Sequence, residues 1–233
     1  MKMEQNSAQV FSENWSIYQK MILHNYMHHA EFANKTANVF AELPQKKLHI
    51  LDIGCGDVMA LLPVLQQTSV ASYTGYDLSS FALQQAAVNL KAQNFSSVLR
   101  QGNMITLIEE EEKQFDVIHS SFAIHHLQDD EKRELLQACF NRLLLGGKMI
   151  YIDVFREQDI SRDRYIEEYF SYIKNDWQLL MASEKQPIYE HVSQYDFPSD
   201  IGETIKWVRL AGFSVYENYR PDHRHAMLVL NKE

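Results

Sequence analysis

Hydrophobic residues recur with two different spacings along the chain. From Phe11 to Leu43, apolar and aromatic residues return every three or four positions, and Pro44 follows. That spacing is typical of an amphipathic helix, and a proline just beyond it suits the helix end. We therefore expect a helical N-terminal segment, in one piece or in two.

After Leu48 the pattern changes to short strand-like runs separated by helical stretches. The runs are "LHILDI" (48–53), "SYTGYD" (72–77), "SVLRQ" (97–101), "FDVIHSS" (115–121) and "KMIYIDVF" (148–155). Helical spacing lies between them, for example over 79–92 and 130–145. This alternation is typical of right-handed βαβ units, and it predicts a doubly wound α/β domain with a mostly parallel sheet.

The last third of the chain differs in character. Residues 156–198 are rich in tyrosine and charge, and a helical pattern then resumes and ends at Gly212. Two final strands, 213–217 and 226–231, are close enough to form an antiparallel hairpin at the sheet edge, which brings the expected number of strands to seven. The acidic run Glu109–Lys113 is expected to be a solvated loop.

Composition restricts the partners. The chain has 233 residues, 45% of them hydrophobic, which suits one substantial domain. Its net charge of −9 argues against binding to nucleic acid or to an anionic membrane. No stretch approaches the ~18 to 20 apolar residues of a membrane span, and we expect a cytoplasmic protein. Cys55 and Cys139 lie far apart, outside any CxxC motif, and are expected to be reduced thiols.

The stretch "LDIGCGDV" (51–58) places Gly54 and Gly56 directly after the first strand. Such a turn lets the backbone approach a ligand closely. A phosphate-binding P-loop would need a lysine that is absent after Gly56, and a dinucleotide site would need a third glycine where Met59 stands. Of the ligand classes that use such a turn, this leaves a ligand that contains a nucleoside and places no pyrophosphate over the turn.

Asp77 follows the turn by about twenty residues, at the expected end of the second strand. A carboxylate in this place accepts hydrogen bonds from both hydroxyl groups of a ribose. Its alternative role is to cap the next helix, which Ser79 or Ser80 would do as well.

From about residue 48 to 155 the chain resembles the class I S-adenosylmethionine-dependent methyltransferases. The resemblance rests on five elements in order: "LDIGCGDV", "GYDLSSFAL", "GNM" (102–104), "FDVIHSSFAIHHL" (115–127) and "LLLGGKMIYIDVF" (143–155). It implies a Rossmann-like fold, S-adenosylmethionine as cofactor and S-adenosylhomocysteine as product. It also implies the cofactor-binding residues Tyr18, Asp52, Gly54, Gly56, Asp77, Leu78, Asn103, Met104, Ser120 and Ser121.

Within this family pattern, Asp52 and the two glycines would line the methionine part and Asp77 the ribose. Asn103 and Met104 would lie against the adenine, where many relatives carry an aspartate before the adenine-facing residue. An amide both accepts and donates, so we expect adenine recognition to persist. Pro63 falls inside the helix after the turn, which would then begin late, near Leu61, or be kinked.

Methyl transfer requires little from side chains, because the sulfonium already makes the methyl group electrophilic. The protein aligns the acceptor and excludes water, and a general base is needed only if the acceptor must lose a proton. His125 is the candidate base, and His126 lies beside it in the expected acceptor region. A structural role in orienting the loop is the alternative for both.

The resemblance also suggests three parts: an N-terminal helical lid (1–44), the Rossmann-like domain (45–233) and a substrate-cap insert within it (156–198). Tyr18 would contact the cofactor from the lid, or else pack as ordinary core. Tyr165 and Tyr169 in the insert are candidate acceptor contacts, although their spacing also suits packing. The insert would alternatively form a contact in a homodimer.

A metal is not expected. His24 and His28 are four residues apart on a predicted helix with Glu31 close by, but such pairs are more often surface histidines.

The sequence therefore predicts methyl transfer to a small-molecule acceptor by in-line attack on the sulfonium methyl group. The "NPPY"-type motif of many nucleobase and protein amine methyltransferases is absent, and "SSFA" stands in its place. Oxygen, carbon, sulfur and aliphatic nitrogen remain open as acceptor atoms. The alternative is a methyltransferase-like protein that binds the cofactor without transferring a methyl group.

Overall fold

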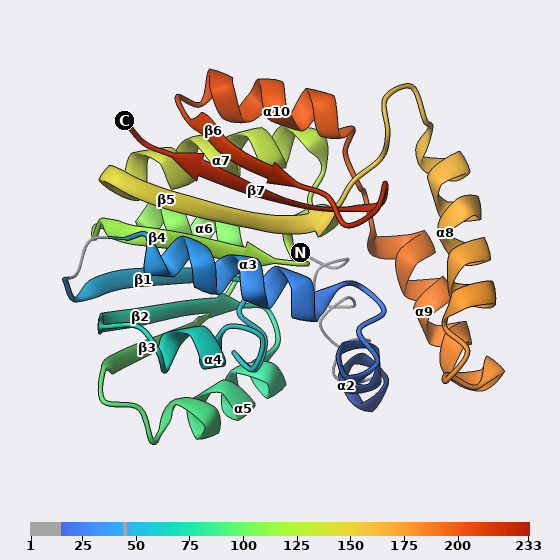
Figure 1. The fold of residues 1–233 in the computed structure, drawn as a ribbon, viewed down its shortest axis with the longest axis horizontal. Coiled ribbons are helices and arrows are strands. Elements are labelled where there is room, and N and C mark those ends of the chain that lie inside the picture. The colour runs from blue at the N-terminus through green and yellow to red at the C-terminus, as the bar shows by residue number, and fades with distance from the viewer. Residues whose placement is uncertain (1–14, 44–45) are drawn as a thin grey trace.

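A twisted seven-stranded sheet forms the centre of the computed structural model, which describes residues 15–43 and 46–233 (Figure 1). Across the sheet the strand order is β3-β2-β1-β4-β5-β7-β6. The strands are β1 (Leu48–Ile53), β2 (Val70–Asp77), β3 (Ser96–Gln101), β4 (Phe115–Ser121), β5 (Leu143–Val154), β6 (Ser214–Tyr219) and β7 (His225–Asn231). The predicted doubly wound α/β fold is confirmed.

The first five strands run parallel, and the last two form the predicted antiparallel hairpin. Because β7 pairs with β5, β6 becomes the edge strand. The order along the sheet reverses between β1 and β4, and at such a point the crevice beyond the carboxyl ends of the strands is where α/β proteins bind ligands. A ligand-binding site is therefore expected beyond the carboxyl ends of β1, β2 and β4.

Helices cover both faces of the sheet. They are α3 (His29–Ala41), α4 (Leu62–Leu65), α5 (Ser80–Leu90), α6 (Met104–Glu110), α7 (Asp129–Arg142) and α10 (Ile201–Leu210). One core cluster joins the sheet to α3, α4 and α5, and the other joins it to α6, α7 and α10 (Figure 1). Because helices cover both faces of the sheet, β1, β4 and β7 are buried along almost their whole length.

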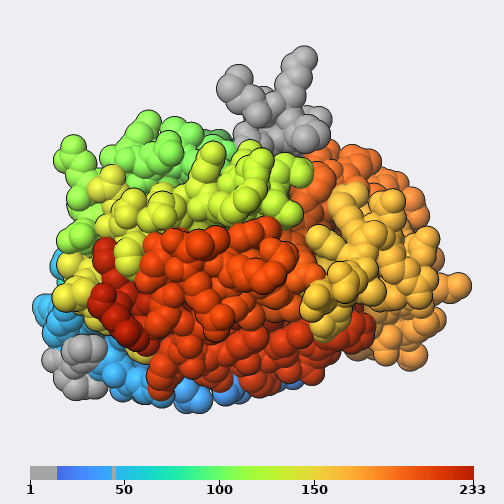
Figure 2. Space-filling model, turned by 90° about the horizontal axis from the view of Figure 1, so that it is seen from above, coloured from blue at the N-terminus to red at the C-terminus, as the bar shows by residue number. Residues whose placement is uncertain are grey.

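The third cluster lies beyond the strand ends. Helices α8 (Arg162–Asp176) and α9 (Ala182–Tyr195) form one end of the molecule, next to α10 (Figure 2). Their inner faces pack around the fully buried Trp177, and the short helix α2 (Trp15–Leu23) joins them through Ile17 and Met21. We call α8 and α9 the cap.

The N-terminal segment divides into two helices with different surroundings. Phe32, Val39 and Phe40 of α3 belong to the same core cluster as β1 and β4, so α3 is a layer of the main domain. Only α2 lies against the cap. The expected division at residue 44 therefore does not separate a lid from the domain, because the apolar face of α3 is buried on the sheet. Residues 11–14 and Pro44 lie outside the described residues.

Two local expectations are corrected. The helix expected over 130–145 ends at Arg142, because Leu143 is extended and already pairs with Phe115 as the first residue of β5. The acidic run is not wholly solvated. Helix α6 continues to Glu110, and Glu111 is buried and accepts a 2.8 Å hydrogen bond from the Tyr76 hydroxyl.

Both cysteines are free thiols and buried, as expected. Burial raises the pKa of each thiol, which keeps it protonated and unreactive. Among the helices of residues 15–43 and 46–233, none has the length and apolar character needed to cross a membrane.

Candidate functional site

The turn after β1 depends on its glycines. Gly54 has φ +69° and Gly56 has φ +53°, both in the left-handed region. A Cβ on Gly54 would stand 2.2 Å from the Cβ of Ala123, so a side chain is excluded there. Val58 also has a positive φ of 66°, and α4 begins only at Leu62, with Pro63 in its first turn. The late helix start predicted from Pro63 is confirmed.

Asp77 closes β2 with its carboxylate on this turn. Oδ2 accepts a 2.8 Å hydrogen bond from the N–H of Gly56, and Oδ1 accepts one of 2.8 Å from the N–H of Ser79. The cap of α5 is Ser79, whose hydroxyl oxygen accepts from Ala82. Burial raises the pKa of Asp77, while the two N–H groups oppose that rise. A carboxylate has about four acceptor positions, so capacity for two ribose hydroxyls remains.

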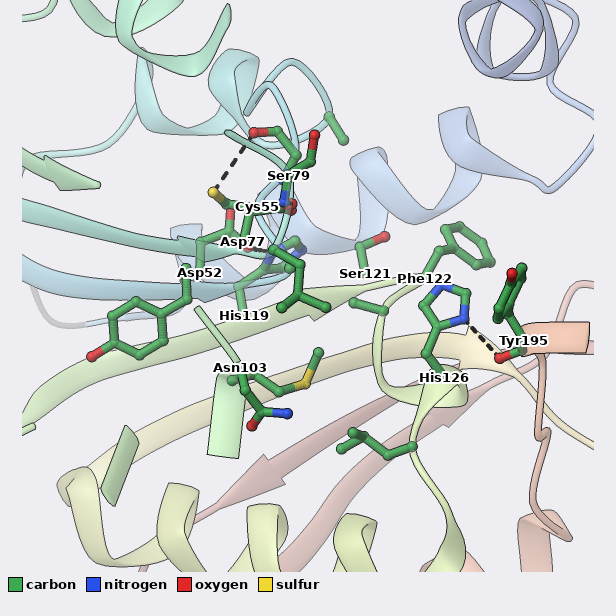
Figure 3. A pocket seen from close by; sticks show the side chains of 18 of the residues that line it. Asp52, Cys55, Asp77, Ser79, Asn103, His119, Ser121, Phe122, His126 and Tyr195 are labelled. Carbon is green, nitrogen blue, oxygen red and sulfur yellow. Dashed lines mark hydrogen bonds and ion pairs between the residues drawn. The ribbon is translucent and has the colours of Figure 1, made fainter. Parts of the chain in front are cut away.

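A cavity of about 290 Å³ opens above this turn (Figure 3). Nine of the ten predicted cofactor residues line it: Tyr18, Asp52, Gly54, Gly56, Asp77, Leu78, Asn103, Met104 and Ser121. They come from α2, from the ends of β1, β2 and β4, and from the start of α6. Segments up to 100 residues apart in the chain thus meet where the strand order reverses.

Two predicted residues have other duties. Ser120 is fully buried outside the cavity lining, and its hydroxyl donates a 2.9 Å hydrogen bond to the carbonyl of Ile53, which ties β4 to β1. Asn103 caps α6, and its Oδ1 accepts from the N–H groups of Ile105 and Thr106. The amide oxygen expected to face adenine is therefore engaged by the helix terminus.

The cavity is acidic. Asp52, Asp57 and Asp77 all line it. Burial and the charges of these carboxylates raise the pKa of Tyr18, which lines the same cavity. Asp52 is held by two neighbours, the hydroxyl of Tyr73 at 2.8 Å and Nδ1 of His119 at 2.7 Å. Such a lining suits a ligand that carries a sulfonium and an ammonium group.

The end of β4 leads from this cavity into a second one. Phe122 has φ +52°, an uncommon conformation for an aromatic residue, and its N–H donates to the carbonyl of Ile152. Non-glycine residues held in such conformations cluster at binding sites. Phe122 lines both cavities, together with Tyr18, His126 and His191.

The second cavity has a volume of about 120 Å³ and lies under the cap. Tyr169, one of the two predicted cap contacts, lines it, and its hydroxyl lies 3.4 Å from Nε2 of His225. Tyr165 does not line either cavity. It is buried and stacks on Tyr169 with ring centroids 5.5 Å apart, so its role is packing.

His125 and His126 form a short 3-10 helix, η1 (Ile124–His126), after β4. Burial alone lowers the pKa of His125, but the charges of Asp153 and Asp196 outweigh it and raise the pKa to about 10. A protonated imidazole does not accept a proton, which argues against the predicted base. Burial and the charge of His125 lower the pKa of His126 to about 3, and His126 lines both cavities.

Several lining residues escaped the sequence analysis. His119, His191, Tyr195 and Phe197 all line the first cavity; His191 and Tyr195 lie on α9, and Phe197 follows it. Figure 3 shows His119 and Tyr195 on opposite sides of the pocket. Nothing in their local sequence distinguishes them from packing residues. Only the single histidine of the insert, His191, and the histidines of "HHL" offered a signal.

Comparisons with known proteins agree with this geometry. Residues 50–147 match the family model described as a methyltransferase domain. A carboxy-S-adenosyl-L-methionine synthase of Idiomarina loihiensis is 23% identical over 185 residues, which span 77% of this chain and 76% of that protein. A ubiquinone biosynthesis O-methyltransferase of Maricaulis maris is 30% identical over 115 residues, 49% of this chain and 44% of the relative.

Solved structures share the fold. The magnesium protoporphyrin IX methyltransferase of Synechocystis PCC 6803 with bound S-adenosylmethionine has a TM-score of 0.67 at 13% identity, covering 100% of this chain and 98% of that one. An O-methyltransferase family 2 protein of Planctomyces limnophilus in complex with apigenin has a TM-score of 0.66 at 15% identity. The match covers 99% of this chain and 62% of that one.

The glycine turn, the half-buried Asp77 and the acidic cavity fit S-adenosylmethionine, the cofactor that the family match implies. Residues 50–147 match a methyltransferase domain, and the fold and cofactor motifs of the chain resemble those of the class I S-adenosylmethionine-dependent methyltransferases.

Proposed function

We propose that this enzyme transfers the methyl group of S-adenosylmethionine to a small-molecule acceptor that binds under the cap. In the reaction the acceptor atom forms a bond to the methyl carbon as the S–CH₃ bond breaks. S-adenosylhomocysteine leaves, and any proton lost by the acceptor passes to solvent or to a neighbouring base. The side chains align the acceptor and exclude water.

The observation that carries the proposal is the pair of adjoining cavities. The larger is lined by the cofactor motifs, and the smaller shares Tyr18, Phe122, His126 and His191 with it. Its other walls are mostly apolar and aromatic, including Met21, Met27 and Trp177. A volume of about 120 Å³ enclosed by three helices suits a metabolite better than a nucleic acid or a protein segment.

Charge and similarity support the same acceptor class. The net charge of −9 opposes nucleic acid. One relative is named a ubiquinone biosynthesis O-methyltransferase, and one structural neighbour was solved with apigenin. Both names point to small organic acceptors, and an oxygen acceptor is the first class to examine.

The test uses S-adenosylmethionine with a labelled methyl group and a cell extract split by dialysis into small molecules and macromolecules. The purified protein is incubated with each fraction, and label and S-adenosylhomocysteine are measured. We expect both to appear with the small-molecule fraction and to be lost with Asp77→Ala. Label in the macromolecular fraction alone would contradict the proposal. Tight cofactor binding without transfer in either fraction would favour the non-enzymatic alternative.

A second candidate is a reaction on the cofactor itself. Two relatives are named carboxy-S-adenosyl-L-methionine synthase, and one of them is similar over 185 residues. Mass spectrometry of the cofactor pool in the same incubations separates the two. A carboxylated cofactor supports the second candidate, whereas S-adenosylhomocysteine together with a methylated metabolite supports methyl transfer.

A further inference from the structure

Four polar side chains meet where η1 faces the end of α9, and we call them the Asp196 cluster: His125, His126, His191 and Asp196. Oδ1 of Asp196 is the centre. It lies 3.5 Å from Nε2 of His125, 3.5 Å from Nδ1 of His126 and 3.6 Å from Nε2 of His191. Asp196 is only 7% exposed, and among the described residues no group donates a hydrogen bond to its Oδ1. A buried carboxylate oxygen of this kind needs a cation nearby. That cation is either the proton on His125 or a metal ion that replaces it, since histidine binds metals in its deprotonated form.

We propose that the Asp196 cluster binds a divalent transition-metal ion of the zinc class. Ligand atoms at zinc bond lengths of about 2.0–2.2 Å around a tetrahedron stand about 3.3–3.6 Å apart. The three nitrogen–oxygen distances fall in this range. In addition, His125, His126 and Asp196 can each offer a ligand atom within 4.8 Å of the others. Imidazole nitrogens with one carboxylate oxygen are the donor set that zinc and its neighbours prefer.

The surroundings hold the ligands in place. Nδ1 of His125 lies 2.5 Å from Oδ1 of Asp153, and Oδ2 of Asp153 accepts a 3.0 Å hydrogen bond from the backbone N–H of His125. This pairing fixes the ring and leaves Nε2 directed at Asp196, as carboxylate–histidine–metal sites require. The N–H of Phe197 donates to the carbonyl of His125 at 2.7 Å, which ties the two ligand segments together.

His126 is the ligand whose present hydrogen bond must be broken when the ion binds. Its Nδ1 lies 3.0 Å from the carbonyl oxygen of Tyr195, and because a carbonyl only accepts, this nitrogen carries the proton (Figure 3). Ligation through Nδ1 would replace that hydrogen bond. His125 would give up the proton on Nε2 on binding the ion. Because the ligand atoms of His125, His126 and Asp196 all lie within 4.8 Å of one another, we infer a site built on these three residues, with His191 as the fourth ligand.

The position suggests what the ion would do. His126 and His191 line both cavities, so the ion would stand at their boundary. An oxygen atom of the acceptor would complete the coordination of the ion. Bound to the ion, that oxygen would lose its proton more easily. This role rests on the proposed function, whereas the metal site does not.

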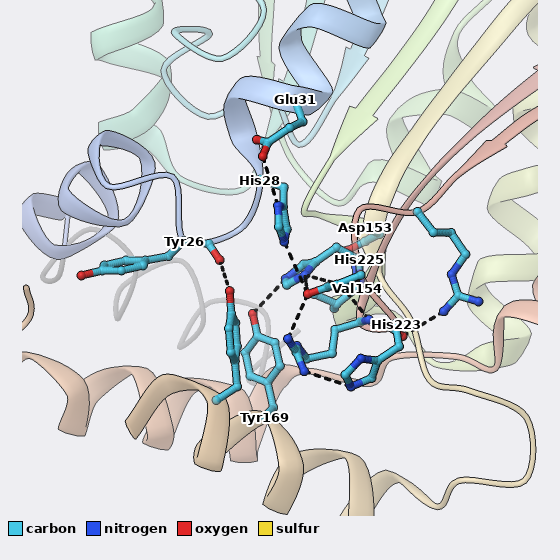
Figure 4. A network of polar contacts seen from close by, with 12 residues as sticks. Tyr26, His28, Glu31, Asp153, Val154, Tyr169, His223 and His225 are labelled. Atoms are coloured by element: carbon cyan, nitrogen blue, oxygen red, sulfur yellow. Dashed lines mark hydrogen bonds and ion pairs between the residues drawn. The ribbon is translucent and has the colours of Figure 1, made fainter. Parts of the chain in front are cut away.

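A second cluster provides the contrast. His28, Asp222 and His225 also approach one another within metal-ligand distance, where the α2–α3 joint meets the β6–β7 hairpin (Figure 4). However, Asp222 accepts from Nδ1 of His225 at 3.0 Å, and the Arg224 guanidinium lies 3.0 Å from its Oδ2. Both oxygens of this carboxylate already have hydrogen-bond or ion-pair partners, unlike Oδ1 of Asp196, so we expect no metal there.

The experiment measures metal uptake without cofactor or acceptor. Full-length protein is stripped with a chelator and titrated with Zn²⁺ by calorimetry, and with Co²⁺ by visible absorption. We expect one equivalent of each to bind and Co²⁺ to give the intense bands of a four- or five-coordinate site. Asp196→Asn and His191→Gln should weaken binding at least about 100-fold. His28→Gln, which alters the contrasting cluster, should bind as the wild type does.

No uptake by the wild type would overturn the proposal, as would equal uptake by the wild type and both cluster variants. Loss of binding in His28→Gln alone would assign the ion to the other cluster and overturn it as well. If Asp196→Asn does not fold, His191→Gln decides, because His191 lies on the surface of α9 with a side chain 21% exposed. Since no acceptor is present, failure of methyl transfer does not affect this result.

Discussion

At the scale of single residues, Asp77 has a structural duty, and we propose a binding duty for it as well. Its carboxylate holds the backbone of Gly56, and it lines the cofactor cavity. Removing the whole side chain would therefore loosen the turn as well as the ligand. The isosteric change to asparagine keeps the shape and removes the charge and one acceptor, and so separates the two duties.

We predict that Asp77→Asn weakens binding of S-adenosylmethionine and S-adenosylhomocysteine by about 10- to 100-fold. The estimate follows from about 1.5–3 kcal/mol for hydrogen bonds to a charged acceptor. Calorimetric titration measures it, with Asp163→Asn in the exposed first turn of α8 as the matched control. Unchanged affinity in folded Asp77→Asn would refute the ribose assignment.

Lys132 makes the stability depend on pH. It is 1% exposed, and its ammonium group donates to the carbonyl of Phe197 and, at 2.6 Å, to the hydroxyl of Ser199. Burial lowers its pKa from 10.5 to about 8, against the opposing charge of Asp129. Between these two pH values the unfolded chain binds more protons than the folded one, so this contribution to stability rises with pH.

The prediction is that wild type gains up to about 3 kcal/mol in free energy of unfolding relative to Lys132→Met as the pH rises from about 7 to 10.5. Urea unfolding at both pH values gives the difference. Lys91→Met, at an exposed lysine after α5, should show no such trend. A pH-independent gap for Lys132→Met would contradict the prediction, because it would mean that the folded and unfolded chains bind the same number of protons at Lys132 over this pH range.

At the scale of elements, the β1–α4 turn and η1 fit against each other. Gly54 and Gly56 both adopt left-handed conformations, but only at Gly54 would a Cβ meet another atom, the Cβ of Ala123. At Gly56 nothing lies within 4 Å. Alanine substitutions at the two positions therefore distinguish the cost of backbone strain, present at both, from that of steric contact, present only at Gly54.

We predict that Gly56→Ala costs about 1–2 kcal/mol from the left-handed backbone alone. Gly54→Ala should lower the free energy of unfolding by about 1–3 kcal/mol more than Gly56→Ala does, because the new Cβ meets Ala123. The double change Gly54→Ala with Ala123→Gly should recover that additional loss. Denaturant unfolding of the variants checks this, and equal losses for both single changes would contradict the proposed contact.

At the scale of the whole molecule, α2 is fastened to the cap across the second cavity. The Tyr26 ring stacks on Trp177 with centroids 5.0 Å apart. Its hydroxyl accepts from the N–H of Leu179 at 2.8 Å, and its carbonyl accepts from the hydroxyl of Tyr172 at 2.7 Å. Lys20 of α2 also pairs with Glu184 of α9. These contacts hold Tyr18 in the lining of the cofactor cavity.

Tyr26→Ala should release α2, raise hydrogen exchange over residues 15–23 and speed cofactor dissociation. Tyr26→Phe, which keeps the stacked ring and loses only the hydroxyl, should have a smaller effect on both. Exchange mass spectrometry and stopped-flow displacement measure the two quantities. If α2 exchanges at the wild-type rate in Tyr26→Ala, the stack does not hold it.

The sequence by itself determined the sheet, the glycine turn and most of the cofactor cavity. Strand and helix spacings, Gly54, Gly56 and Asp77 are local signals, because each reflects what its own segment must do. Nine of ten predicted cofactor residues line the cavity for this reason. Ser120 was the exception, because neighbouring residues of a strand point to opposite faces and only one of Ser120 and Ser121 can reach the ligand.

Only the tertiary structure decided what surrounds the second cavity, where we propose that the acceptor binds. His125, His191 and Asp196 lie far apart in the chain, and their meeting depends on how α9 packs against η1. The division of the N-terminal segment was likewise a matter of packing, since the same helical spacing serves α3 on the sheet and α2 on the cap. Periodicity reports that a helix has an apolar face, and the partner of that face follows from long-range contacts alone.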